Sequence, residues 1–461
     1  MSSQNMKKLQ VHFLGGSGTV TGSKFYLHTE EIKILVDCGV FQGTKELREQ
    51  NWRSLPVDAS QIDVVLLTHG HLDHCGYLPL LVKQGFSGDI LGTAPSLEIA
   101  KIILEDSAKI HEEEAERANE EGYSKHDPAL PLYTEEDVAH TLKFFKSIEE
   151  GEEIGLSPNC RACFKYNGHI IGSTFIEIDL YGKILVFSGD VGRQDDHLLN
   201  PPKQPQWADY LFVESTYGDR NHPDEDVEGI LQDLVDQTLR KKGTLIIPSF
   251  AVERLQSLMY VLWQLYHKNK IPNIPIFVDS PMGTNVLGVF ENYPDWHKLS
   301  MHEYHNMCNH ITLVSSYRET WETIDDPRPK IVIAGSGMVT GGRVLTYIKQ
   351  LAEKKSTTIL LVGFQAEETR GRKLLEGERE LKIFGKYVPI NAKVVHLESL
   401  SAHADQTELL SWMGSIKNVP EKIFLVHGEK EAMAVYKEKI HEKFGWNCHV
   451  PELHEVVEIL L

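Results

Sequence analysis

Three histidines and one aspartate lie close together in the segment THGHLDHCG, directly after the apolar run VVLL. These residues are His69, His71, Asp73 and His74. Two histidines separated by one residue can point at one cation, and the aspartate and histidine that follow can face a second. Imidazole and carboxylate ligands suit zinc better than calcium or magnesium, which prefer oxygen ligands. Two metal ions ~3.5–4 Å apart can clamp a phosphate or carbonyl oxygen, and a polar loop with incidental histidines is the weaker alternative.

Other ligand-type side chains follow other apolar runs, at the points where strands would end. Asp37 follows KILV, Asp190 follows ILVFSG, Glu214 follows YLFV and His427 follows IFLV, while His169 precedes the hairpin that leads to Asp190. Because ligand groups at the carboxyl ends of strands share one edge of a sheet, we expect these side chains to gather there. Taken singly, each is also compatible with an ordinary turn or strand-end residue.

The apolar pattern predicts the elements that would position these residues. Short strands joined by turns are expected at VHFLGG, KFYLH and KILVDCG, and FIEIDLYGKILVFSGD predicts a hairpin that turns at Tyr181 and Gly182. LDHCGYLPLLVKQG predicts a helix whose start is set by Asp73, and residues 95–150 are expected to be mostly helical. From about residue 220, strands alternate with amphipathic helices, which is typical of a sheet covered by helices. The predicted fold class is therefore α/β.

The composition, with 41% hydrophobic and 25% charged residues, is that of an ordinary globular protein. No apolar run approaches the ~18 residues of a membrane span, and the first residues lack the apolar core of a signal peptide. Six scattered cysteines favour a reducing compartment, so we expect a cytoplasmic protein with no membrane partner. Cys160 and Cys163 form one C-x-x-C without a second pair, which favours ordinary thiols over a redox or metal role.

The net charge of −19 argues at first against a nucleic-acid partner, but this charge is unevenly distributed. Residues 98–153 hold 17 acidic and 6 basic residues, a net charge of −11, so the other 405 residues carry only −8. We expect this acidic segment to be a solvated helical face, with a partner surface as the alternative. A more basic groove elsewhere is compatible with the sequence.

The order H-x-H-x-D-H, followed by a later His, Asp and His, resembles the signature of the metallo-β-lactamase superfamily. This resemblance implies an αββα sandwich that binds two Zn²⁺ ions per chain. The implied ligands are three side chains for each ion and one bridging carboxylate: His69, His71 and His169; Asp73, His74 and His427; and Asp190. Asp37, in LVDCG, matches an aspartate that positions the ligand histidines.

The 237 positions between Asp190 and His427 leave room for a second α/β domain. With the motifs FVESTYG, IPSFAVERLQ, FVDSPMG, AGSGMVTGGR and SLSAHADQTELL, the chain resembles the β-CASP group of nucleases. That group includes the RNA 3′-end processing endonuclease subunit of the cleavage and polyadenylation machinery and its bacterial and archaeal homologues. The resemblance implies a metallo-β-lactamase domain at 1–215 and 395–461, and a β-CASP domain at 216–394 that caps the active site. Because the chain ends soon after His427, we expect no further domain.

The same resemblance assigns roles to further residues. Asp73 would orient a hydroxide nucleophile, and His403, polarised by Glu214, would give the departing sugar oxygen its proton. The alternative for His403 is a surface histidine in a turn. A Gly-rich turn and nearby arginines are candidate phosphate contacts, with a structural role as the equal alternative: Ser336, Gly337, Met338, Arg343, Arg254 and Arg370.

These features predict a zinc-dependent ribonuclease, an RNA-binding endonuclease of RNA processing or decay. Exonuclease action from the 5′ end, single-stranded DNA as a substrate and a homodimer are left open. The alternative enzyme is a metallo-hydrolase of the same fold that acts on small esters, lactones, thioesters or small phosphodiesters. A scaffold subunit without metals is a third hypothesis, and the presence of every ligand residue argues against it.

Overall fold

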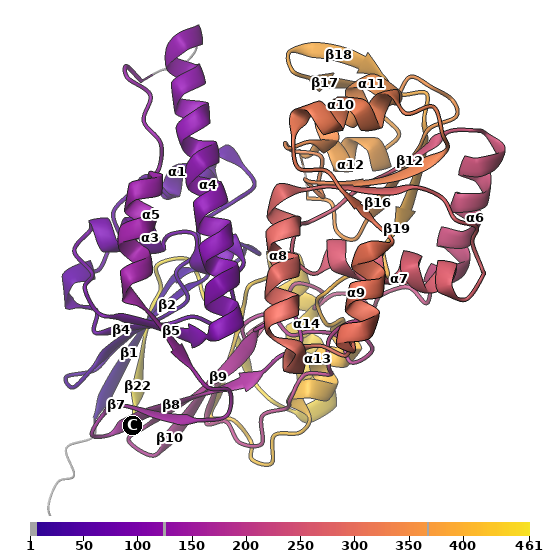
Figure 1. Cartoon of the computed structure of the whole chain (residues 1–461). Helices are drawn as coiled ribbons and strands as arrows, with labels where there is room; N and C mark the ends of the chain where they lie inside the picture. The colour runs from indigo at the N-terminus through magenta and orange to yellow at the C-terminus, as the bar shows by residue number, and fades with distance from the viewer. Residues whose placement is uncertain (1–6, 123–125, 367) are drawn as a thin grey trace, which may run out of the picture. The chain divides into compact units, whose positions relative to one another are not determined.

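The computed structural model describes residues 7–122, 126–366 and 368–461, and the chain forms two compact units. Unit 1 comprises residues 1–194, 201–221 and 403–461, and unit 2 comprises residues 195–200 and 222–402. Each unit has sheets and a hydrophobic core of its own (Figure 1). Among the described residues, no helix combines the length and apolar character that crossing a bilayer requires.

Unit 1 contains two seven-stranded sheets. Across the first sheet, the strand order is β22 (Val456–Leu460), β1 (Lys8–Gly15), β2 (Lys24–His28), β3 (Lys33–Val36), β4 (Val64–Leu66), β5 (Asp89–Thr93) and β6 (Phe145–Ile148). Across the second sheet, it is β21 (Cys448–His449), β20 (Lys422–Val426), β11 (Tyr210–Glu214), β10 (Lys183–Phe187), β9 (Thr174–Leu180), β8 (Cys160–Tyr166) and β7 (Glu153–Ser157). Both sheets mix parallel and antiparallel pairs.

The facing sides of the two sheets bury a core that is rich in phenylalanine. Phe13 and Phe25 come from the first sheet, and Phe187, Phe212 and Phe424 come from the second. The ring of Phe212 stacks between the other two rings of its sheet, with centroid distances of 4.1 and 4.6 Å. Because side chains alternate between the faces of a strand, the outer faces of both sheets are left for helices.

Helices cover these outer faces. With the first sheet lie α1 (Lys45–Gln50), α2 (Leu72–Cys75), α3 (Leu78–Lys83), α4 (Ala94–Glu121) and α5 (Glu135–Thr141), together with the short 3₁₀ helices η1 (Ala59–Gln61) and η2 (Leu142–Phe144). On the second sheet, a separate apolar cluster packs α13 (Gln406–Met413) and α14 (Lys430–Phe444). The resulting helix–sheet–sheet–helix layers confirm the predicted fold class.

Two local predictions have different outcomes. The hairpin turn at Tyr181 and Gly182 is confirmed, since their φ angles of 53° and 82° join β9 to β10. The prediction that Asp73 sets the start of one long helix is wrong, because His71 holds the N-cap position of α2 and a second helix begins at Leu78. The physical reason for the break is Pro79. Because proline has no backbone N–H, it cannot donate the hydrogen bond that would continue a helix, but it suits the first turn of a new one.

Unit 2 is built around a six-stranded, all-parallel sheet with the order β14 (Thr312–Leu313), β13 (Ile276–Asp279), β15 (Lys330–Ala334), β12 (Thr244–Pro248), β16 (Thr358–Val362) and β19 (Lys393–Leu397). Its helices are α6 (Val227–Arg240), α7 (Arg254–His267), α8 (Pro281–Asn292), η3 (Pro294–Trp296), α9 (Met301–Asn309), α10 (Tyr317–Asp325), α11 (Val344–Leu351) and α12 (Arg370–Leu375). A separate hairpin joins β17 (Glu380–Ile383) to β18 (Lys386–Pro389). The predicted alternation of strands and helices is thereby confirmed.

Candidate functional site

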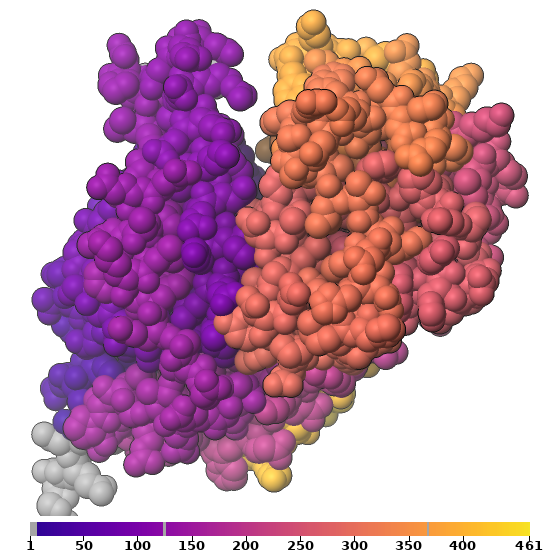
Figure 2. Space-filling model, viewed as in Figure 1, coloured from indigo at the N-terminus to yellow at the C-terminus, as the bar shows by residue number. Residues whose placement is uncertain are grey.

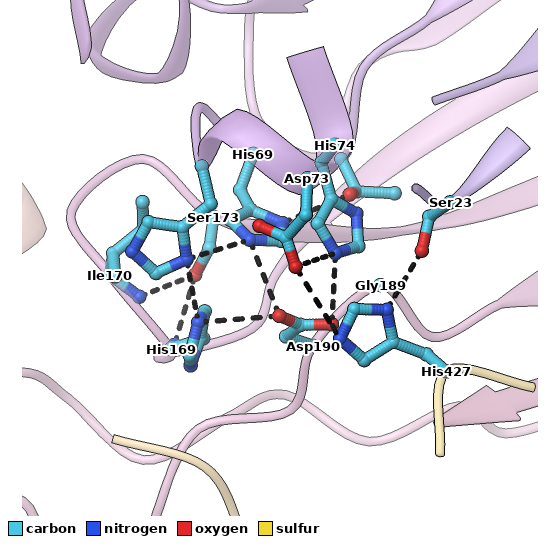
Figure 3. Close-up of polar contacts among 12 residues, drawn as sticks. Ser23, His69, Asp73, His74, His169, Ile170, Ser173, Gly189, Asp190 and His427 are labelled. Atoms are coloured by element: carbon cyan, nitrogen blue, oxygen red, sulfur yellow. Dashed lines mark hydrogen bonds and ion pairs between the residues drawn. The ribbon is translucent and has the colours of Figure 1, made fainter. Parts of the chain in front are cut away.

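The crowded loop after β4 lies at the carboxyl end of the first sheet of unit 1. β4 is parallel to β3 and β5, so polar residues that follow these strands share one edge. The structure brings all seven predicted ligands together at one place in unit 1, in two neighbouring groups of donor atoms. Figure 3 labels all of them except His71.

The first group consists of three imidazoles and one carboxylate. His71 Nδ1 lies 3.1 Å from His69 Nε2 and 3.2 Å from His169 Nε2. Asp190 Oδ2 lies 3.4 Å from His69 Nε2 and 3.5 Å from His169 Nε2. Four ligands held tetrahedrally ~2.0–2.1 Å from a zinc ion would be about 3.3 Å apart. The donor set and its spacing therefore fit a zinc ion.

The second group uses the other oxygen of Asp190. Asp190 Oδ1 lies 3.2 Å from His74 Nε2 and 3.6 Å from His427 Nε2. Asp73 Oδ2 lies 3.7 Å from His427 Nε2 and 4.0 Å from His74 Nε2. The two carboxylate oxygens of Asp190 therefore face different groups of donor atoms.

The electrostatics of the site favour a cation. His74 Nε2 and Asp190 Oδ1 are buried and face each other at 3.2 Å, and within the described part of the chain neither has a further hydrogen-bond partner. Buried polar atoms are rarely left without a partner, and a metal ion would satisfy both. Burial, the largest cause, lowers the pKa of His71 and of His427 to about 3, which favours neutral imidazoles, the form that binds a metal. At His74 burial also lowers the pKa, but the carboxylates of Asp190 and Asp37 outweigh it and raise the pKa above its ordinary value, so a cation is favoured between these acidic groups.

Asp37 holds the ligand loop from behind. It is buried, and its Oδ2 accepts a hydrogen bond of 2.8 Å from His74 Nδ1, which directs His74 Nε2 towards the site. Its Oδ1 accepts the Thr68 backbone N–H at 2.8 Å. The Thr68 hydroxyl also donates to Asp37, so Thr68 Oγ1 is left to accept a hydrogen bond from His69 Nδ1 at 3.1 Å. One carboxylate thus orients two ligand histidines.

Ser23 has a similar role and lies near Asp37, because β2 begins where the antiparallel β3 ends. Its hydroxyl is hydrogen-bonded to His427 Nδ1 at 2.8 Å, which fixes the orientation of this imidazole (Figure 3). Sequence reasoning missed both Ser23 and Thr68. The position of Thr68 directly before His69 is a signal that was available, whereas no local pattern points from Ser23 to a histidine 404 positions away.

Glu214 and His403 form a pair at the edge of the cluster. His403 Nδ1 lies 3.4 Å from Glu214 Oε1, and its ring centroid lies 4.4 Å from that of His169. Glu214 is fully buried and also accepts the Val191 backbone N–H at 2.6 Å. Burial lowers the pKa of His403, but the Glu214 carboxylate outweighs it, and the net pKa is above the ordinary value. The imidazole is therefore suited to carry a proton beside the donor groups.

The six predicted phosphate contacts lie in unit 2 instead, near the carboxyl ends of its parallel strands. The Ser336 hydroxyl accepts the backbone N–H groups of Thr340 and Gly341 at 3.0 and 3.1 Å, which closes the Gly-rich turn that also contains Gly337 and Met338. Arg343 Nη1 donates to the buried carboxylate of Asp279 at 3.0 Å.

The other two arginines also contact groups within unit 2. Arg370 donates to the carbonyls of Thr340 and Lys382, at 3.0 and 2.8 Å. Arg254 lies against Gly363 so closely that a Cβ at this glycine would be 2.7 Å from Arg254 Nη1. These arginines have structural contacts, and their proposed role in RNA binding stays a prediction.

Comparison with known proteins identifies three regions of the chain. Residues 19–232 match the metallo-beta-lactamase superfamily, residues 255–374 match the Beta-Casp domain, and residues 387–451 match the Zn-dependent metallo-hydrolase RNA specificity domain. A protein of unknown function from Enterococcus faecalis V583 has a similar fold, with a TM-score of 0.54 and 14% sequence identity over 98% of this chain and 100% of its own.

Curated relatives match over nearly the whole chain. Ribonuclease TTHA0252 from Thermus thermophilus is 33% identical over 91% of this chain and 93% of its own length. Transcription termination factor FttA from Methanocaldococcus jannaschii is 30% identical over 96% of this chain and 70% of its own. The extent of these matches and the His/Asp cluster lead to one conclusion: the chain belongs to the metallo-β-lactamase superfamily as a β-CASP metallo-hydrolase with an RNA specificity domain.

Proposed function

We propose that this protein is a zinc-dependent ribonuclease that hydrolyses internal phosphodiester bonds of RNA, in RNA processing or decay. The observation that carries the proposal is the Glu214–His403 pair beside the two donor groups. A phosphodiester expels a sugar oxygen, which needs a proton, and an imidazole that titrates near neutral pH can supply it. Zinc ligands alone would serve any hydrolase of this fold equally well.

The proposal includes two zinc ions per chain, because the two oxygens of Asp190 face separate donor groups. His69, His71 and His169 would hold one ion, and Asp73, His74 and His427 the other. Zinc bound there would lower the pKa of water towards ~7 and neutralise charge on a phosphate.

Side chains of this protein would then control the attack and the departure. Asp73, whose carboxylate faces the site, would orient the attacking water. Glu214 accepts from His403 Nδ1, so the imidazole would release its proton from Nε2 to the sugar oxygen. This division of roles predicts that His403 matters for RNA more than for substrates whose leaving groups need no proton.

Several features expected from the sequence stay predictions. These are the phosphate contacts in unit 2, the domain borders after residues 215 and 394, and a cytoplasmic location. Action on single-stranded DNA and homodimer formation stay open in the same way. The relatives named as ribonuclease and termination factor support RNA as the substrate class.

A comparison of three substrates tests the proposal. The zinc-loaded chain is incubated with a structured RNA, a chromogenic phosphodiester and a β-lactam. We expect cleavage of the RNA and a loss of this cleavage in His403→Ala, with the chromogenic phosphodiester less affected because its phenolate leaves without a proton. RNA that stays intact with zinc present, beside rapid hydrolysis of a small substrate, would contradict the ribonuclease and support a small-molecule hydrolase.

A further inference from the structure

The β17–β18 hairpin lies at the surface of unit 2 (Figures 1 and 2), and two of its aromatic residues are exposed. The exposed fraction is 56% for Phe384, in the turn, and 66% for Tyr387, on the second strand. The other face of the hairpin is anchored, because Leu381, Ile383 and Val388 are buried in the core of unit 2. The two rings therefore project from a fixed support.

The turn of this hairpin is unfavourable for its own sequence. Phe384 and Gly385 have φ angles of 48° and 75°, as in a type I′ turn. The first position of such a turn favours Asn, Asp or Gly, because a bulky side chain is strained at positive φ. Since more than half of the Phe384 ring is exposed, burial does not offset that strain. An outlier of this kind points to a function.

A second hairpin provides an internal comparison. Tyr181 and Gly182 form the same kind of turn, with φ angles of 53° and 82°. There the aromatic residue has a structural role, since the Tyr181 hydroxyl donates to Glu31 Oε2 at 2.6 Å. The Phe384 ring has no polar atom, and the Lys349 ammonium lies 5.4 Å from its centroid. A lysine lies near both rings, since the Lys7 ammonium is 5.9 Å from the Tyr181 centroid, so the difference is that Phe384 has no anchoring hydrogen bond from its ring.

Lysines flank the two rings, although the chain carries a net charge of −19. The hairpin, residues 380–389, contains Lys382 and Lys386 beside one acidic residue, Glu380, at the far end of β17 from the turn. Lys382 lies directly opposite Tyr387 in the strand register. Arg370 donates to the Lys382 carbonyl and to the Thr340 carbonyl, so it ties the hairpin to the Gly-rich turn. Aromatic rings among lysines complement the bases and phosphates of a single strand of nucleic acid.

We propose that this hairpin binds single-stranded RNA, with bases stacked on Phe384 and Tyr387 and phosphates beside Lys349, Lys382 and Lys386. The inference rests on the proposed ribonuclease function and narrows its substrate to RNA with unpaired segments. Stacking accepts any base, because every base has a π-face. Bases within a duplex are already stacked on each other, so the hairpin would bind loops or unpaired ends.

The substitution Phe384→Asn separates binding from folding. Asn is preferred at this turn position, so we expect an unchanged or higher Tm. Loss of one stacked base should raise the Kd for a single-stranded RNA about 5- to 150-fold. Binding is measured by fluorescence anisotropy on the full zinc-loaded chain, with His403→Ala in the background to keep the RNA intact. The matched control, Tyr181→Asn, should lower the Tm and leave the Kd unchanged.

The three lysines have a separate signature. Replacing Lys349, Lys382 and Lys386 by Gln should reduce the slope of log K against log salt by up to about 2, since each phosphate contact on a single strand contributes ~0.7. An unchanged Kd in Phe384→Asn would overturn the proposal, and so would an equal loss for a blunt RNA duplex. An altered oligomeric state with unchanged RNA affinity would assign the hairpin to a protein contact instead. If the wild-type chain binds RNA through the hairpin but does not cleave it, only the ribonuclease function is refuted.

Discussion

The substitution Asp37→Asn should weaken zinc binding without removing any ligand. Asp37 is buried, and it accepts hydrogen bonds from Thr68 and from His74 Nδ1. An asparagine can keep its oxygen on the Thr68 N–H, but its amide then faces His74 Nδ1 with a second donor. To relieve this conflict, the His74 proton must move to Nε2, the atom that faces Asp190. A protonated Nε2 cannot bind a metal ion.

The expected magnitude follows from this lost hydrogen bond. A hydrogen bond to a charged group contributes about 1.5–3 kcal/mol, and loss of a residue that orients a metal ligand lowers metal affinity about 10- to 100-fold. In Asp37→Asn we therefore expect the Kd of the more weakly bound zinc ion to rise about 10- to 100-fold. This corresponds to a loss of about 1.4–2.7 kcal/mol of binding free energy. The ion bound by Asp73, His74 and His427 should be affected most, because His69 keeps its contact with Thr68.

Competition with a chromogenic zinc chelator measures both zinc affinities. The matched control is Asp63→Asn, because Asp63 lies at the opposite end of the same strands and accepts the Lys33 backbone N–H at 2.8 Å, far from any ligand. The control should keep wild-type zinc affinity. If Asp37→Asn binds both ions within about twofold of wild type, Asp37 does not orient His74 and the reasoning is refuted.

Three further results are expected. Glu214→Gln removes the charge that faces His403 Nδ1, so single-turnover RNA cleavage should fall about 10²–10⁴-fold at unchanged zinc content; an unchanged rate would make Glu214 purely structural. Phe212→Ala empties the centre of the stacked core and should lower the free energy of unfolding by about 3–5 kcal/mol in urea; a loss below about 1 kcal/mol would contradict the packing. Hydrogen bonds from three neighbours lower the pKa of Glu31 from 4.5 to about 2, so its stabilisation is full above pH 4.5 and disappears as the pH falls towards 2. Glu31→Gln should therefore lose less stability than wild type between these pH values, and equal losses would argue against this role.

The candidate site could be anticipated because its residues follow apolar strands. Asp37, Asp190 and His427 are far apart in the sequence, but Asp37 and His427 directly follow buried strands and Asp190 follows another after Ser188 and Gly189. Strand ends meet at one sheet edge, so the pattern predicts proximity without any knowledge of the fold. Individual strands followed in the same way from short apolar runs, and the Tyr181–Gly182 turn followed from its dipeptide. The two-sheet architecture was implied only by the resemblance to the metallo-β-lactamase superfamily.

Other features depend on contacts between distant segments. β2 runs antiparallel to β3, so Ser23, just before β2, lies at the carboxyl end of β3 and there reaches His427. No spacing in the sequence encodes this pair. Arg343 is a residue type that commonly contacts phosphates, but the buried Asp279 at the end of β13 determines the direction of its guanidinium. The start of α2 was misplaced because capping propensity favours Asp73, whereas the loop geometry turns its carboxylate towards the site.

The most direct test of the central claim is the fate of the attacking oxygen. RNA is cleaved by the zinc-loaded chain in oxygen-18-labelled water, and the fragment ends are analysed by mass spectrometry. Hydrolysis by water at the zinc site predicts one labelled oxygen in each newly formed terminal phosphate. Fragments that end in an unlabelled 2′,3′-cyclic phosphate would show attack by the RNA's own hydroxyl and would contradict the proposed mechanism.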